Sequence, residues 1–165
     1  MNIALVLSGG IGTRLGSELP KQYWEVAGKP VIVHTLKQFE RFQRIAGVIV
    51  VASAEWTAHI WEWKEAYSLS KLWDVAPAGV DRQRSILSGL LAAKRFMKEE
   101  AGGVIVQDAV RPLISQDLLQ RLVNGLEEAP AVMPVLPITD TAYTSQDGRC
   151  VSGLLNRSTL FAGQA

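Results

Sequence analysis

The chain has 165 residues, 48% hydrophobic and 20% charged, a composition that fits one globular domain and excludes an intrinsically disordered chain. Its 17 cations and 16 anions nearly cancel, so the charge balance gives no reason to expect a nucleic-acid partner or a membrane partner. The single cysteine, Cys150, excludes an intrachain disulfide. With no signal peptide in the pattern, we expect a cytoplasmic protein.

Apolar, β-branched runs alternate with segments of helical periodicity along most of the chain. Strands are expected at residues 3–7, 48–52, 75–77, 104–107 and 131–136. Helices are expected at residues 31–44, 55–67, 82–99 and 116–128, with Asp81 and Ser115 as N-caps. Apolar strands that alternate with helices are typical of a sheet covered on both faces. The sequence therefore predicts an α/β fold with a doubly wound, mostly parallel sheet.

The segment 55–67 carries an apolar stripe at helical spacing, made of Trp56, Ile60, Trp63 and Tyr67. A stripe of this kind is typical of a helix that packs on a core. We therefore expect it to face the sheet rather than to bind a ligand.

The pattern changes after Pro137. Residues 141–144 and 150–153 flank Asp147-Gly148, a dipeptide typical of a hairpin turn. We interpret residues 139–153 as a β-arm that projects from the sheet and packs against a partner subunit, and an ordinary surface hairpin fits the same pattern equally well. The chain stops soon after the apolar pair Leu160-Phe161. We therefore expect residues 1–165 to form a single domain that is incomplete at its C-terminus.

The first predicted strand leads into a glycine-rich segment that ends in two cations. It reads Ser8-Gly9-Gly10-Ile11-Gly12, followed by Arg14 and Lys21. Unobstructed backbone N–H groups can surround phosphate oxygens, and the cations can neutralise them. The P-loop pattern fails because Pro30 follows Gly28-Lys29, and the dinucleotide pattern fails because Leu15 replaces its last glycine. The sequence predicts a third kind of phosphate loop, which binds a nucleoside triphosphate.

Several stretches together resemble the cytidylyltransferases that activate sugar-alcohol phosphates, the 2-C-methyl-D-erythritol 4-phosphate and D-ribitol 5-phosphate enzymes. They are Ser8-Gly-Gly-Ile-Gly-Thr-Arg14, Pro20-Lys-Gln-Tyr23, Gly28-Lys-Pro30, Asp81-Arg-Gln-Arg-Ser85 with Gly89-Leu90, Asp108-Ala-Val-Arg-Pro112, Asp140-Thr141, Asn156-Arg-Ser158 and Gly163-Gln164. The resemblance implies a Rossmann-like nucleotidyltransferase that transfers CMP from CTP to a polyol phosphate, releases pyrophosphate and uses Mg²⁺.

The resemblance also implies a role for each matching residue. Arg14 and Lys21 match the catalytic cations at the α-phosphate. Residues that match CTP-binding positions are Ser8, Gly9, Gly10, Ile11, Gly12, Gly79, Arg82 and Ser85. Residues that match acceptor-binding positions are Asp108, Arg111, Thr141 and Arg157, and Asp108 is also the expected Mg²⁺ ligand. In the family, the residues at positions 141 and 157 come from the arm of a second subunit, which implies a homodimer formed through the β-arm.

Some positions depart from the family pattern, and other interpretations remain open. Gln107 stands where many methylerythritol-phosphate enzymes have histidine, and Tyr143 where they have lysine. These departures leave the acceptor open, whereas Asp108-Ala-Val-Arg-Pro112 and Asn156-Arg-Ser158 are slightly more similar to the ribitol-phosphate branch. Alternative functions are a nucleotidyltransferase that uses another nucleotide or a sugar 1-phosphate, and a non-catalytic nucleotide-binding module. Without the resemblance, Arg82 would be a solvated cation, Ser85 a helix-surface serine, and Asp108 a capping residue or a partner of Arg111.

Overall fold

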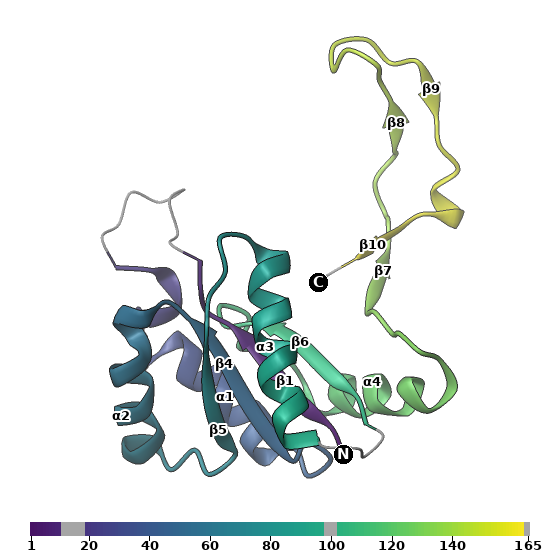
Figure 1. Cartoon of the computed structure of the whole chain (residues 1–165). Helices are drawn as coiled ribbons and strands as arrows, with labels where there is room; N and C mark the ends of the chain where they lie inside the picture. Colours follow the sequence, from purple (N-terminus) through teal and green to yellow (C-terminus); the bar gives the residue numbers. More distant parts are fainter. Residues whose placement is uncertain (11–18, 98–101, 164–165) are drawn as a thin grey trace.

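The computed structural model describes residues 1–10, 19–97 and 102–163, and its centre is a four-stranded parallel sheet (Figure 1). The strands are β1 (Ile3–Leu7), β4 (Gly47–Ala52), β5 (Leu72–Pro77) and β6 (Val104–Asp108). They lie in the order β5-β4-β1-β6. Strands β1 and β4 are almost continuously apolar and buried, as expected for a parallel sheet with both faces covered.

Helices connect these strands and cover both faces of the sheet. They are α1 (Val31–Arg41), α2 (Thr57–Tyr67), α3 (Arg82–Met97) and α4 (Gln116–Glu128). Because successive strand side chains point to opposite faces, Ala4 and Val6 pack in one core with residues of α1, α2 and α4. Ile3 and Leu5 pack in a second core with residues of α3. The predicted α/β fold with a doubly wound, mostly parallel sheet is confirmed.

Local signals locate most of the helices well. Both predicted N-caps are confirmed: the Ser115 hydroxyl accepts the Leu118 N–H at 3.1 Å, and the Asp81 carboxylate accepts the Arg84 N–H at 2.7 Å. The predicted stripe of α2 faces the core, where Ile60 is fully buried, and a 3-10 helix, η3 (Ala54–Trp56), precedes it. No helix among the described residues has the length and apolarity needed to cross a membrane.

The prediction of a fifth sheet strand at residues 131–136 is wrong. Residues 131–134 form no strand, and β7 (Val135–Pro137) pairs antiparallel with β10 (Phe161–Gly163) outside the parallel sheet. Pro134 lies inside the predicted run and has no N–H to offer a neighbouring strand. An apolar run therefore marks an extended segment here without identifying its partner.

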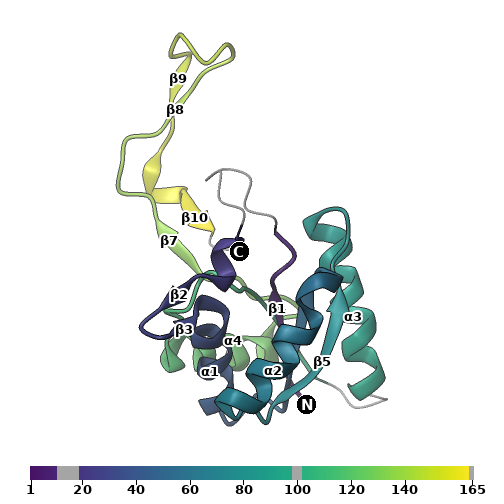
Figure 2. The same cartoon turned by 90° about the vertical axis from the view of Figure 1, so that its left-hand side faces the viewer.

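The hairpin β8 (Tyr143–Thr144) and β9 (Gly153–Leu154) lies away from the parallel sheet in both views (Figures 1 and 2). A short 3-10 helix, η4 (Arg157–Thr159), leads from β9 toward β10. The Asp147 carboxylate organises the turn by accepting the N–H groups of Arg149 and Cys150 at 2.8 and 2.9 Å. The packing of this hairpin against a partner subunit stays a prediction.

Between β1 and α1 the structure adds elements that the sequence patterns did not reveal. The 3-10 helix η2 (Lys21–Tyr23) is followed by a two-stranded hairpin, β2 (Glu25–Val26) and β3 (Lys29–Pro30). Its two turn residues, Ala27 and Gly28, have φ angles of 51° and 72°. Two successive left-handed residues are typical of the tightest hairpin turns.

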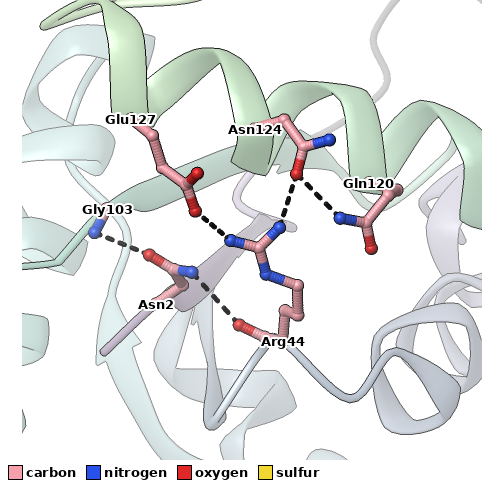
Figure 3. A network of polar contacts seen from close by, with 6 residues as sticks. All are labelled: Asn2, Arg44, Gly103, Gln120, Asn124 and Glu127. Carbon is pink, nitrogen blue, oxygen red and sulfur yellow. Dashed lines mark hydrogen bonds and ion pairs between the residues drawn. The ribbon is translucent and has the colours of Figure 1, made fainter.

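Polar side chains tie elements together at the amino end of the sheet (Figure 3). The Asn2 carboxamide accepts the Gly103 N–H at 2.9 Å and donates to the Arg44 carbonyl at 3.2 Å. The Arg44 guanidinium donates to Asn124 and pairs with Glu127, both on α4. This network joins four parts of the fold: the start of β1, the connection before β4, the connection before β6, and α4. It lies at the amino end of the parallel sheet, opposite to the carboxyl ends of the strands.

Candidate active site

The carboxyl ends of three neighbouring strands meet at one edge of the sheet. Leu7, the last residue of β1, is in register with Val51 of β4 and with Asp108, the last residue of β6. Open α/β sheets bind ligands outside the carboxyl ends of their strands. The glycine-rich segment leaves β1 at this edge, as the sequence predicted.

The first residues after β1 are held close to their neighbours. Ser8 is buried, and its N–H donates to the Val51 carbonyl at 2.7 Å. A Cβ on Gly9 would lie 2.5 Å from the Cβ of Ala78, a separation that real side chains do not tolerate. A Cβ on Gly10 would meet no atom of the described residues within 4 Å. Of these two glycines, Gly9 is therefore the one that a close approach within the described residues requires.

Gln22 and Tyr23 of η2 contact this segment, although no role was predicted for them from the sequence. The Gln22 carboxamide donates to the Ser8 and Gly10 carbonyls at 2.9 and 2.8 Å. The Ser8 hydroxyl donates to the Tyr23 hydroxyl at 2.8 Å, and Tyr23 donates to the Ser8 carbonyl at 3.2 Å. Burial raises the pKa of Tyr23, against the lowering effect of its hydrogen bond to Ser8. The sequence signal for these residues is their place beside Lys21 in the Pro20-Lys-Gln-Tyr23 stretch of the family resemblance.

The turn between β5 and α3 lies against the glycine segment. Ser85 is 7% exposed, so it is not a helix-surface serine. Its hydroxyl accepts the Gly79 N–H at 3.0 Å and donates to the Asp81 carbonyl at 2.9 Å. A Cβ on Gly9 would lie 3.8 Å from the Ser85 hydroxyl oxygen. The predicted CTP-binding residues Gly9, Gly79 and Ser85 are thus neighbours in space.

Asp108 is paired with two arginines at the same edge. One carboxylate oxygen accepts a hydrogen bond from Arg82 at the start of α3, and the other accepts from the Arg111 Nε at 3.1 Å. The Asp108 side chain is 18% exposed, and those of Arg82 and Arg111 are 46% and 48% exposed. The structure therefore brings together one predicted CTP-binding residue and two predicted acceptor-binding residues, with both cations accessible to a ligand.

The carboxylate of Asp108 also bears on the predicted Mg²⁺ site. Among the described residues, no group of three or more His, Cys, Asp or Glu side chains comes together to hold a metal ion. Nucleotide-bound Mg²⁺ needs no such group, because one or two carboxylates, substrate phosphates and water complete its six ligands. Each Asp108 oxygen keeps a lone pair beside its arginine. Asp108 therefore fits an ion that is held mainly by the nucleotide.

Other predicted site residues lie apart from this edge or outside the described residues. Thr141 and Arg157 line a hollow of about 500 Å³ beside the β8–β9 hairpin, where Arg157 donates to the Thr139 carbonyl at 2.9 Å. The hairpin of the arm is remote from the sheet in both views (Figures 1 and 2). Lys21 is the first residue of η2. The positions of Ile11, Gly12 and Arg14 lie outside the described residues.

Comparison with known proteins connects this arrangement to a family. The model of the family described as 2-C-methyl-D-erythritol 4-phosphate cytidylyltransferase (IspD) matches residues 2–165. The chain is 31% identical over 166 residues to the ribitol-5-phosphate cytidylyltransferase of Streptococcus agalactiae serotype Ia, covering 100% of this chain and 69% of that relative. It is 37% identical over 164 residues to the bifunctional enzyme IspD/IspF of Allorhizobium ampelinum, covering 97% of this chain and 40% of that protein.

A solved structure agrees with the fold. The 4-diphosphocytidyl-2C-methyl-D-erythritol synthase from Anaerococcus prevotii superimposes with a TM-score of 0.81 at 24% identity, over 99% of this chain and 68% of that chain. The resemblance drawn from the motifs is confirmed, because the family model spans nearly the whole chain and the curated relatives carry the same class of activity in their names. The chain belongs to the 2-C-methyl-D-erythritol 4-phosphate cytidylyltransferase (IspD) family of nucleotidyltransferases.

Proposed function

We propose that this protein transfers CMP from CTP to a polyol phosphate and releases pyrophosphate. A phosphate oxygen of the acceptor attacks the α-phosphorus of CTP, a new P–O bond forms, and the bond to the β-phosphate breaks. The observation that carries the proposal is the meeting of Gly9, Ser85, Arg82, Asp108 and Arg111 at one sheet edge, in a chain of this family.

Charge neutralisation is the main requirement of this chemistry, because both reactants are anions. Arg14 and Lys21 are the proposed catalytic cations at the α-phosphate, where negative charge develops. The backbone of residues 8–12 approaches the base and phosphates of CTP. Arg111 binds the acceptor phosphate, since a guanidinium offers two parallel N–H groups to phosphate oxygens.

Selection of cytosine is proposed for the turn around Ser85. The Ser85 hydroxyl donates its proton to the Asp81 carbonyl and accepts the Gly79 N–H, so one lone pair of the oxygen is left as an acceptor. Cytosine presents an amino donor where uracil presents a carbonyl oxygen. An acceptor in this position favours CTP over UTP, and this supports the proposed nucleotide.

The proposed cofactor is Mg²⁺, with Asp108 as its protein ligand. When bound, the ion would neutralise phosphate charge in the transition state. Arg82 and Arg111 already hold both Asp108 oxygens, so they position the carboxylate at the sheet edge before any ion arrives. Their guanidinium groups are about half exposed at the sheet edge where the nucleotide and the acceptor are proposed to bind.

The active unit is proposed to be a cytoplasmic homodimer formed through the arm. Within one chain, Thr141 and Arg157 share a hollow on the arm, whereas Asp108 and Arg111 lie at the sheet edge. An arm that reaches a second subunit would bring the two sets together. Dimerisation stays a prediction.

The test is pyrophosphate release from CTP and Mg²⁺, with 2-C-methyl-D-erythritol 4-phosphate and D-ribitol 5-phosphate measured side by side. Release with one acceptor only would identify both the reaction and the acceptor. Parallel reactions with UTP, GTP and ATP test the alternative of another nucleotide. Tight CTP binding without turnover for any acceptor would favour a non-catalytic module. The absence of both CTP binding and pyrophosphate release would contradict the proposal.

A further inference from the structure

Gln22 is a buried polar residue that the proposed mechanism does not use. Its side chain is 5% exposed, and its carboxamide nitrogen donates to two carbonyls of the glycine segment, those of Ser8 and Gly10. Both hydrogens of the nitrogen are therefore committed to the segment that leaves β1. We infer that Gln22 is a positioning residue for the triphosphate, one that holds these carbonyl oxygens away from the phosphates. The inference rests on the proposed function.

The direction of a carbonyl decides the direction of the next N–H. In a planar trans peptide the C=O of one residue and the N–H of the following residue point in opposite directions. Because the Ser8 carbonyl points to Gln22, the Gly9 N–H points away from Gln22. Phosphate oxygens are attracted by backbone N–H groups and repelled by carbonyl oxygens. The orientation set by Gln22 therefore makes this end of the segment attractive to a phosphate.

A segment that contains glycine needs such a restraint more than other segments do. Among the described residues, no atom lies within 4 Å of a Cβ position on Gly10, so packing against them does not restrict its peptide. Glycine also has access to a wider range of backbone angles than any other residue. The hydrogen bond from Gln22 to the Gly10 carbonyl, at 2.8 Å, supplies the restraint that packing lacks.

Gln22 is itself held in place by its neighbours. The next residue, Tyr23, stacks on Trp56 with ring centroids 3.8 Å apart and an interplanar angle of 24°. Tyr23 also lies 5.7 Å from Trp63 of α2, centroid to centroid. Lys21 precedes Gln22 in the same 3-10 helix. The aromatic contacts therefore hold η2, and Gln22 joins the glycine segment to the 3-10 helix that carries the proposed catalytic lysine.

A purely structural role for Gln22 makes a different prediction. A buried amide that only satisfies two carbonyls contributes to folding, and its loss affects every ligand of the site to the same extent. A positioning role affects only ligands with phosphates. The ratio of the affinities for CTP and for cytidine separates the two, because cytidine keeps the base and ribose and has no phosphate.

The experiment compares wild-type protein with Gln22→Met, which keeps the length of the side chain and removes both donors. We expect CTP affinity to fall about tenfold to a hundredfold, the range for a misplaced binding group, with cytidine affinity unchanged. Gln116→Met is the matched control, since Gln116 donates to the Gln38 carbonyl at 3.0 Å on an exposed surface. CTP binding is measured by calorimetry, cytidine binding by ligand-observed NMR, and folding by circular dichroism.

Equal losses for CTP and cytidine, or no loss for either in a folded variant, would overturn the inference. If Gln22→Met does not fold, Gln22→Glu allows the same comparison with an isosteric side chain. Its protonated form donates a hydrogen bond and its ionised form does not, so the CTP-to-cytidine ratio should recover as pH falls. Wild-type protein that binds no CTP would instead contradict the proposed function.

Discussion

Gly9→Ala is the substitution whose effect the structure defines most directly. The new Cβ would lie 2.5 Å from the Cβ of Ala78, whereas carbon atoms in contact are about 3.5–4.0 Å apart. The end of β1 and Ala78 would therefore have to separate by about 1 Å or more. Ala78 cannot yield easily, because its N–H donates to the Ala52 carbonyl at 2.8 Å. Overpacking of this kind costs about 1–3 kcal/mol of folding free energy.

The assay is thermal and urea unfolding followed by circular dichroism. A loss of about 1–3 kcal/mol should lower the unfolding midpoint by about 2–4 °C for each kcal/mol in a chain of this size. Gly10→Ala is the matched control. Its Cβ meets no atom of the described residues within 4 Å, and the substitution should change stability by less than about 0.5 kcal/mol. Equal stability of the two variants would refute the reasoning. Gly9→Ala should also weaken CTP binding, since Ala78 precedes the proposed cytosine turn.

Three further predictions concern the site and the arm. Lys21→Ala should lower the rate of pyrophosphate release on the order of a hundredfold. The control Lys94→Ala, at an exposed position of α3, should leave that rate unchanged. Ser85→Ala should reduce the preference for CTP over UTP about tenfold in competition assays, the value of one buried hydrogen bond. Hydrogen bonds from backbone N–H groups, that of Cys150 first, hold the pKa of Asp147 below its usual range. Its contribution to the turn is therefore complete above the unfolded pKa of about 3.9 and is lost as pH falls through the lower folded pKa. Amide exchange in this turn, corrected for intrinsic rates, should accelerate only in that acidic range.

Much of the fold could be predicted from local patterns. Continuous apolar runs located β1 and β4, and the N-cap side chains of Asp81 and Ser115 located the starts of two helices. These signals are readable because strand and helix periodicity and capping depend on residues within one or two turns of each other. The same reasoning failed for residues 131–136, because pairing of β7 with β10 depends on a segment more than twenty residues away.

The candidate site was predicted in part. The order of the motifs indicated the nucleotide chemistry, and the family model agrees with it. Asp108 forms ion pairs with Arg82 and Arg111. The pairing with Arg111 was one of the alternatives considered from the sequence, whereas the pairing with Arg82 was not predicted. Arg82 reaches Asp108 only because the turn before α3 and the end of β6 lie at the same edge of the sheet. No periodic pattern records that proximity.

The sequence by itself determined the class of fold and the residues that carry the family resemblance. Only the tertiary structure decided which strand β7 pairs with and that Gln22 holds the Ser8 and Gly10 carbonyls. The physical reason is the distance along the chain over which the deciding interactions act. Secondary structure follows from interactions between near neighbours in the chain, whereas a site is assembled by side chains that sheet order and helix packing bring together from distant segments.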